Sequence, residues 1–124
     1  MFGSIIPYIW FLKLTSMINS DLPEINLTGE KKVKQWLAEN GYTNISAELL
    51  NATEFGLKAK GSIEDILVQV KTFLHPHRPF KLSDYQIDLL IRRATKLNMV
   101  AYAAYVVVDA NAELLEEINW ERLS

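Results

Sequence analysis

The chain has 124 residues, of which 49% are hydrophobic and 23% charged, and this supports one domain with its own core. It contains no cysteine, which excludes disulfides, thiol nucleophiles and thiolate-held zinc or iron–sulfur sites. The net charge of -2 provides no general attraction to polyanions, so a nucleic-acid site would depend on where individual charges lie. We expect a cytoplasmic protein with one domain over residues 21–124 and an apolar N-terminal extension over residues 1–20.

The N-terminal extension is apolar between Ile5 and Leu12, but Pro7 interrupts the run and Lys13 ends it. A membrane-spanning helix needs about 20 predominantly apolar residues, and a secretory signal begins with a basic segment. The run has neither property, so we expect no stable membrane span. A segment packed on the domain and an upstream extension with Met17 as an alternative start both fit this composition, and a membrane-proximal role is a weaker alternative.

The first predicted helix runs from about Gly29 to Asn40. Thr28 is placed as its N-cap, and Gly41 is placed as its left-handed stop. Its buried stripe follows the helical spacing i, i+3, i+4 and consists of Val33, Trp36 and Leu37.

Three strands are predicted after this helix. Residues 42–50 alternate through Ile45, Ala47 and Leu49, and residues 55–60 alternate through Phe55, Leu57 and Ala59, as half-buried strands do. Residues 66–73 are almost continuously apolar except for Gln69 and Lys71, which share one face because strand side chains alternate. An unpaired ammonium is very unfavourable inside a protein, so this buried strand is a candidate site.

A second helix is predicted after a loop over residues 74–80, where two prolines prevent a regular element. Ser83 and Gln86 form a capping-box pattern, and the helix then continues to about Leu97. Residues 99–108 are predicted as another apolar strand, and residues 114–123 as a short strand or helix. The helix is expected to bury Ile87, Leu90, Ile91 and Ala94 and to expose Asp88, Arg92, Arg93 and Lys96.

The predicted order is therefore helix, three strands, helix, strand. The three strands form a meander, and the crossover through the second helix makes the fourth strand parallel to the third. This predicts an α/β fold with a mixed central sheet flanked by helices.

Short stretches of the chain match, in the same order, the motifs of a known superfamily. They are Gly29-Glu30, residues 37–42, residues 57–61, residues 68–72 and Gln86. On these residues the chain resembles the PD-(D/E)xK nuclease superfamily, with its restriction-endonuclease-like fold, particularly its Mrr-type and Holliday-junction-resolvase-like members. The likeness extends over about residues 29–108.

The resemblance implies a magnesium or manganese site on the second and third strands. Relatives bind the metal through an Asp on the second strand and an acidic residue two positions before the Lys. Here Gln69 stands at the acidic position, as some Mrr-type members tolerate, and Gly56 stands at the Asp position. Glu54 is expected on the same strand face as Gly56, near this vacancy. The implied metal ligands are Glu54, Gln69, the Val70 carbonyl and Glu30.

Glu30 has two interpretations. It resembles the helix-borne acid that many relatives add to the metal ligands, and an acidic residue in a helix's first turn is also favoured by the helix dipole. Lys71 resembles the residue that holds the scissile phosphate, and the alternative is an edge-strand lysine that reaches solvent. The resemblance thus implies an Mg²⁺-dependent DNA endonuclease with Lys71, Gln69 and Glu54 as catalytic residues, or an inactive module that binds DNA or a protein.

Further residues are expected to contact DNA, and relatives often pair as homodimers. The candidates are His77, Arg78, Lys81, Gln86 and Arg92. For Gln86 the simpler role is its capping box, and for Arg92 a solvated helix face. His75 and His77 also have the spacing of a metal pair, but no third ligand lies near them in the sequence.

Overall fold

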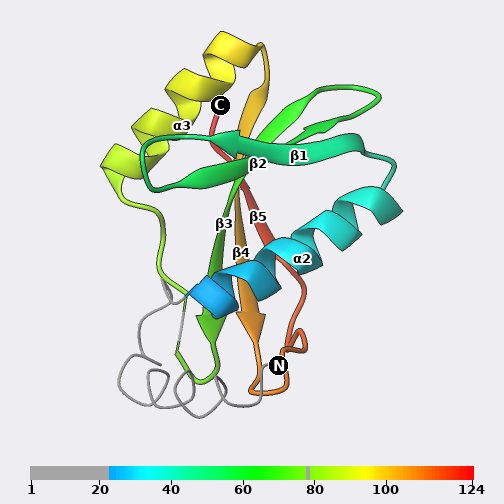
Figure 1. Cartoon of the computed structure of the whole chain (residues 1–124), viewed down its shortest axis with the longest axis vertical. Helices are drawn as coiled ribbons and strands as arrows, with labels where there is room; N and C mark the ends of the chain where they lie inside the picture. The colour runs from blue at the N-terminus through cyan, green and yellow to red at the C-terminus, as the bar shows by residue number, and fades with distance from the viewer. Residues whose placement is uncertain (1–22, 78) are drawn as a thin grey trace.

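The computed structural model describes residues 23–77 and 79–124, so the predicted extension over residues 1–20 and the predicted DNA contact Arg78 lie outside the described residues. The elements follow one another in the predicted order, with one further strand at the C-terminal end (Figure 1). They are α2 (Pro23–Glu39), β1 (Thr43–Leu49), β2 (Phe55–Lys60), β3 (Ile66–Leu74), α3 (Asp84–Leu97), β4 (Val100–Val108) and β5 (Asn119–Arg122).

The five strands form one mixed sheet in the order β1-β2-β3-β4-β5. The first three strands are antiparallel neighbours, and β4 lies parallel to β3 from Ile66 beside Val100 to Leu74 beside Val108. The meander and the parallel crossover predicted from the sequence are therefore confirmed. The last segment, predicted as a strand or a helix, is a strand antiparallel to β4.

The two helices cover opposite faces of the sheet, so the molecule has two apolar layers (Figure 1). On the α2 side, Val33 and Leu37 pack against residues that include Val68 and Val106. On the α3 side the buried residues include Leu67, Phe73, Leu90, Ala94 and Ala103. None of the helices in residues 23–77 and 79–124 is both long and apolar enough to cross a membrane.

Helix α2 begins six residues earlier than predicted, at Pro23 rather than Gly29. Proline suits a first helical turn, because the N–H that it lacks has no partner there. Thr28 is therefore inside the helix, and its prediction as the N-cap is wrong. The predicted stop is confirmed, because Gly41 follows the helix with a φ of 88°.

Gly29 lets α2 lie directly against β3. A Cβ at this position would lie 1.7 Å from Thr72 Oγ1 and 2.8 Å from Thr72 Cβ. Any side chain here would move the helix off the strand. The glycine that appeared to open the helix is therefore a close-packing position in its second turn.

Strand β1 is where it was predicted, but its buried face is different. Leu49 is 50% exposed and Glu48 is buried, which is the opposite of the face expected from Ile45, Ala47 and Leu49. The register against β2 shifts between Thr43 and Ser46, and Asn44 has a positive φ of 53°. An irregularity of this kind changes which side chains point inward.

Glu48 is buried in an ion-pair cluster that joins the β1–β2 hairpin to α3. Arg93 Nε donates to its carboxylate at 2.8 Å, and Lys58 Nζ lies 3.2 Å from it. The Arg93 hydrogen bond keeps the pKa of Glu48 below its ordinary value against the opposing effect of burial. The prediction that Arg93 points to solvent with Arg92 is wrong, because it turns toward this acid.

Helix α3 has the predicted capping box. Ser83 Oγ accepts from the Gln86 N–H at 3.2 Å, and Gln86 Oε1 accepts from the Ser83 N–H at 2.9 Å. Asn98 ends the helix in the left-handed conformation. The cap fixes the position of the Gln86 side chain, which also lines the cleft of the candidate site.

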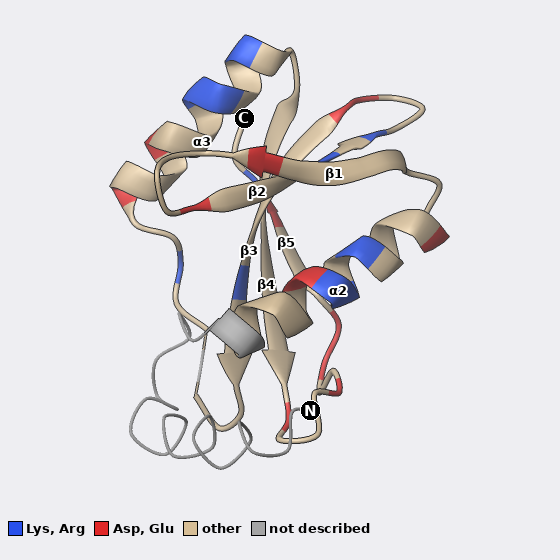
Figure 2. Ribbon diagram, in the orientation of Figure 1, with Lys and Arg blue, Asp and Glu red and all other residues tan. Residues whose placement is uncertain are grey.

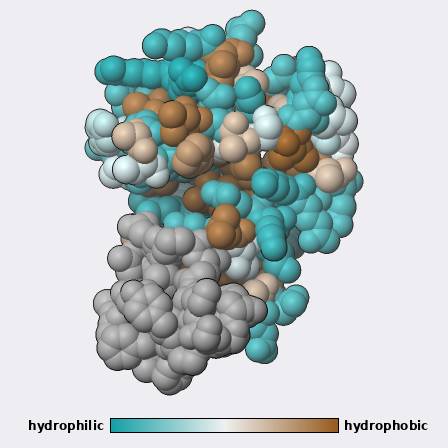
Figure 3. All heavy atoms as spheres, viewed as in Figure 1, coloured by the Kyte–Doolittle hydropathy of each residue, from teal (hydrophilic) through white to brown (hydrophobic). Residues whose placement is uncertain are grey.

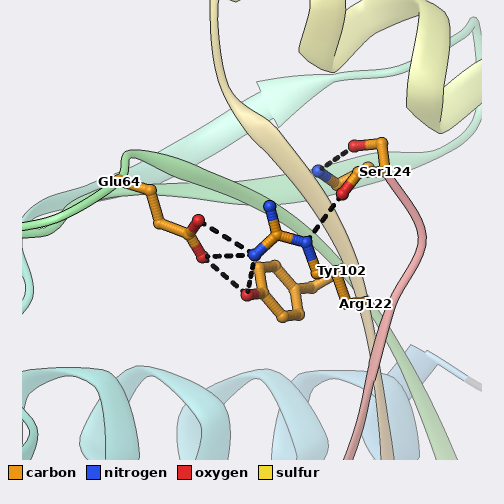
Figure 4. Close-up of polar contacts among 5 residues, drawn as sticks. Glu64, Tyr102, Arg122 and Ser124 are labelled. Atoms are coloured by element: carbon orange, nitrogen blue, oxygen red, sulfur yellow. Dashed lines mark hydrogen bonds and ion pairs between the residues drawn. The ribbon is translucent and has the colours of Figure 1, made fainter.

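A polar cluster ties β5 to the turn between β2 and β3 (Figure 4). The Tyr102 hydroxyl donates to Glu64 at 2.6 Å, and Arg122 Nη1 donates to both the Glu64 carboxylate and the Tyr102 oxygen. The Tyr102 hydrogen bond keeps the pKa of Glu64 below its ordinary value, and the same bond raises the pKa of Tyr102. Ser124 completes the cluster by accepting from Arg122 and from the Ala101 N–H. The acid, the phenol and the guanidinium thus satisfy one another.

Candidate functional site

A cleft of about 560 Å³ lies where β2 and β3 separate. The register of β2 with β3 ends at Leu57 beside Val68, whereas β3 continues beside β4 as far as Leu74. The second half of β3 therefore has no β2 neighbour in this register, and its side chains border the cleft. The residues that line it are Asn26, Leu27, Glu30, Thr53, Glu54, Phe55, Gln69, Val70, Lys71 and Gln86.

This cleft brings together every predicted catalytic and metal-binding residue. Three separate parts of the chain contribute them: helix α2 with Glu30, the turn before β2 with Glu54, and strand β3 with Gln69, Val70 and Lys71. Gln86 in the first turn of α3, which was predicted as a DNA contact, lines the same cleft. Their roles remain predictions, but their location in one cleft is a property of the fold.

Glu54 lies in the turn between β1 and β2, not on a strand as expected. Asn51 Oδ1 accepts from the N–H groups of Thr53 and Glu54 at 2.9 and 2.8 Å, and the Leu50 N–H donates to the Glu54 carbonyl at 2.8 Å. Such an Asx turn is a local conformation that asparagine favours. The expectation that Glu54 shares a strand face with Gly56 is therefore wrong, but the turn still delivers Glu54 to the cleft.

The Glu54 carboxylate is held by two amide side chains. Gln86 Nε2 donates to Oε2 at 3.1 Å, and Asn51 Nδ2 lies 3.4 Å from Oε1. Because the Gln86 carbonyl is fixed by the Ser83 N–H, the amide group of Gln86 is oriented at both ends. The capping role predicted for Gln86 is therefore confirmed, and the same side chain also contacts the acid Glu54 in the cleft.

Gln69 and Lys71 come from the open half of β3. Gln69 is buried, and Ala103 lies beside it on β4. Lys71 is half-buried, and its Nζ lies 5.4 Å from the centre of the Phe80 ring, within the range of a cation–π contact. This lysine borders the cleft beside an aromatic face.

Gly56, at the position where the resemblance to the nuclease superfamily would place an Asp, has little room for a side chain. A Cβ there would lie 3.0 Å from the Val68 carbonyl oxygen and 3.4 Å from methyl groups of both Leu50 and Leu67. Its neighbour across the hairpin is Glu48, which is paired with cations. The carboxylates of this cleft therefore come from other elements.

Glu30 is the second acid of the cleft. It lies in the interior of α2, because the helix begins at Pro23. Its interpretation as a first-turn acid favoured by the helix dipole is therefore wrong, since that effect falls off within the first turn. The interpretation that remains for Glu30 is that of a helix-borne acid at the cleft.

Of the predicted DNA contacts that the structure describes, only Gln86 lines the cleft. Lys81 pairs with Glu121 of β5 at 2.9 Å, and Arg92 pairs with Asp88 of its own helix at 3.0 Å. Figure 2 shows acidic residues at the beginning of α3 and basic residues toward its end, away from the turn that carries Gln86. His77 is half-buried, and its N–H donates to the Leu74 carbonyl.

The cleft provides a donor set that suits magnesium. Magnesium is a hard cation that is usually bound by one or two carboxylates with several waters, and Glu54, Glu30 and the Gln69 amide supply oxygen donors of this kind. Within residues 23–77 and 79–124, no group of three His, Asp or Glu side chains could hold a metal by itself. His75 and His77 therefore have no third such ligand among the described residues. A cation here would therefore depend on the amide and on waters.

Sequence reasoning missed two features of the site. It did not find the ion-pair cluster of Glu48, Arg93 and Lys58, because the apolar alternation of β1 pointed to the other face. It also missed Asn26 and Leu27 as cleft residues, because they precede the predicted start of the helix. The signal that was available for the second feature is Pro23, a residue typical of a first helical turn.

Comparisons of the chain with models of protein families, with curated proteins and with solved structures each returned no significant match.

Proposed function

We propose that the protein is a restriction-endonuclease-like nuclease that hydrolyses DNA phosphodiester bonds with Mg²⁺ or Mn²⁺. The observation that supports this best is the cleft itself, which is lined by two acids, two glutamine amides and a lysine from four parts of the chain. A mixed sheet with helices on both faces is also consistent with that fold.

Each residue has a role that follows from its chemistry. Lys71 offsets the charge that develops on the scissile phosphate, a role suited to a compact ammonium. Glu54, Glu30, the Gln69 amide and the Val70 carbonyl would hold a cation, and a bound cation would supply an activated water and offset phosphate charge. Gln86 orients Glu54 through its Nε2 hydrogen bond.

The alternative is a nuclease-shaped module without activity that binds DNA or a protein. The observation that favours it is Gly56, where a side chain would meet Val68, Leu50 and Leu67. A chain that has lost the principal ligand of its relatives would retain the fold while losing the cation. The two functions differ in whether the purified protein shows any metal-stimulated cleavage.

The test is nicking of supercoiled plasmid by the purified protein in Mg²⁺ and in Mn²⁺. The nuclease proposal predicts cleavage that EDTA abolishes and that Lys71→Ala reduces by roughly 100-fold or more, as for the loss of one transition-state contact. Lys34→Ala is the matched control, because Lys34 is an exposed lysine of α2 that does not line the cleft.

The same assay separates the two functions. Cleavage that disappears in Lys71→Ala and persists in Lys34→Ala supports the nuclease. No metal-stimulated cleavage of either supercoiled or heat-denatured plasmid by wild type, in either cation, would overturn it and leave the binding module. Equal cleavage by wild type and Lys71→Ala would point to a contaminating nuclease or to another site, and would also contradict the proposal.

A further inference from the structure

One exposed phenylalanine ring lines the cleft, and a second lies beside the cleft lysine Lys71. Phe55 lines the cleft and is 55% exposed, and Phe80, whose ring centre lies 5.4 Å from Lys71 Nζ, is 60% exposed. They come from the start of β2 and from the loop before α3, which are far apart in the sequence. Figure 3 shows apolar side chains reaching the surface among hydrophilic ones across the middle of the face viewed.

The Phe80 ring packs against another aromatic ring of the protein core. It meets the buried Phe73 of β3 edge to face, with 5.1 Å between the ring centres. Such an arrangement is favourable for aromatic pairs, so the ring is held in place while much of its surface stays in water. An aromatic ring fixed beside an ammonium offers, side by side, the two contacts that a nucleotide needs: a stacking surface for its base and a cation for its phosphate.

We propose that the site accepts an unpaired DNA strand, whose bases stack on Phe80 and Phe55 while the phosphate between them faces Lys71. This inference rests on the proposed function and names its substrate class. It explains why apolar rings face water at the cleft, where a purely structural role would bury them. Aromatic stacking is tolerant of sequence, so the proposal predicts a preference for strandedness and not for particular bases.

The side chains at the cleft suit contact with bases. Among the described residues that line it, Lys71 is the one cation, while the exposed ring of Phe55 lines the cleft and that of Phe80 lies beside the lysine. A duplex presents its phosphates outward and keeps its bases stacked inside, whereas an unpaired strand can place its bases on aromatic side chains. Exposed rings beside one cation therefore favour a single strand over a duplex.

The test is binding of a fluorescein-labelled single strand and of the same strand in a duplex, measured by fluorescence anisotropy in EDTA and again in Ca²⁺. Neither condition requires cleavage, so the result does not depend on the nuclease activity. The proposal predicts that the single strand binds more tightly than the duplex. Phe80→Ala and Phe55→Ala should each weaken single-strand binding by roughly five- to 150-fold, the range for loss of one stacked base.

Two further variants control this measurement. Phe80→Trp keeps a stacking surface and should retain at least the wild-type affinity, which separates stacking from a loss of folding. Ile63→Ala removes an apolar side chain that is 95% exposed in the turn before β3 and does not line the cleft, and it should leave binding unchanged. Thermal unfolding of each variant checks that the Phe80 and Phe73 contact is not needed for folding.

The outcomes distinguish this inference from the nuclease proposal. Equal or tighter duplex binding, or unchanged single-strand binding in both alanine variants, would overturn the strand inference. If the plasmid assay then still shows cleavage that depends on Lys71, the nuclease proposal stands without it. Single-strand binding that depends on both rings, together with no cleavage of a single-stranded substrate in Mg²⁺ or Mn²⁺, would support the strand contact and overturn the nuclease.

Discussion

Two glutamates near the β1–β2 hairpin have opposite surroundings. Glu48 is buried, and both Arg93 and Lys58 pair with its carboxylate. Glu54 lines an open cleft, and its carboxylate contacts the neutral amides of Gln86 and Asn51. Among the residues that the structure describes, no Lys or Arg lies within ion-pair distance of Glu54.

The difference indicates what each acid can do. A buried carboxylate with two cations has its charge already neutralised, and its contribution is to hold α3 against the hairpin. A carboxylate oriented by amide side chains can still offer its oxygens to a cation. We therefore assign Glu48 to structure and propose Glu54 for function, although both are acids close to the vacant position of Gly56.

The largest expected effect is that of Glu54→Gln on cleavage. The change keeps the shape of the side chain and an acceptor for Gln86, but it removes the charge that would bind the cation. Metal-dependent nicking should fall by roughly 100-fold or more, with little change in the free energy of unfolding. Plasmid nicking and urea denaturation measure the two effects, and a variant that cleaves as well as wild type would exclude Glu54 as a ligand.

Gln86→Ala, compared with Ser83→Ala, separates the capping role of Gln86 from its contact with Glu54. Both changes remove half of the capping box, so each should lower stability by about 0.5–2 kcal/mol. Only Gln86→Ala removes the Glu54 partner, and it should reduce metal-dependent cleavage by roughly 10- to 100-fold, as for other groups that orient a ligand. Equal cleavage rates in the two variants would show that the Glu54 contact has no part in function.

Glu48→Gln should lower stability and leave cleavage nearly unchanged, which is the opposite of the effect expected for Glu54→Gln. Loss of this charge leaves Arg93 and Lys58 beside each other without an anion, and the free energy of unfolding should fall by about 1–3 kcal/mol, because both cations remain partly solvated. Urea denaturation measures this loss. Cleavage at a temperature where the variant is folded should stay within a few-fold of wild type, and a specific loss of cleavage would move Glu48 into the site.

Acid should remove the stabilising effect of Glu48. Its pKa in the folded state lies below the ordinary value of 4.5, so its contribution is fully present above that pH and is lost as the pH falls through the lowered value. The difference in unfolding free energy between wild type and Glu48→Gln should be constant near neutral pH and should shrink below about pH 4.5. Urea denaturation from pH 7 downward tests this, and a difference that grows in acid would contradict it. Glu64 and Glu121 also have lowered pKa values, but both residues are present in wild type and in the variant. Their contributions therefore cancel in the difference between the two unfolding free energies.

The sequence predicts the architecture well where the signals are local. The Ser83 and Gln86 cap, the prolines of the loop, and the buried strand carrying Gln69 and Lys71 all depend on residues close together in the chain, and the structure has these elements at the predicted positions. The parallel crossover then follows from chain geometry.

The errors arise where a local pattern fits more than one structure, or where a distant contact decides. Thr28 is a residue type that is typical of an N-cap, but the helix begins N-terminal to it, at Pro23. The irregularity in β1 near Asn44 and the Arg93 side chain from α3 together bury Glu48, and no pattern within β1 reports either. Glu54 reaches the cleft through a turn built on Asn51, which the strand periodicity could not indicate.

The most direct test of the contrast between the two acids is calorimetric titration of Mn²⁺ into wild type, Glu54→Gln and Glu48→Gln. The account predicts that wild type and Glu48→Gln bind the cation with similar affinity, and that Glu54→Gln loses binding. Equal binding by all three proteins, or none by wild type, would contradict the assignment of Glu54 as the acid that holds the metal.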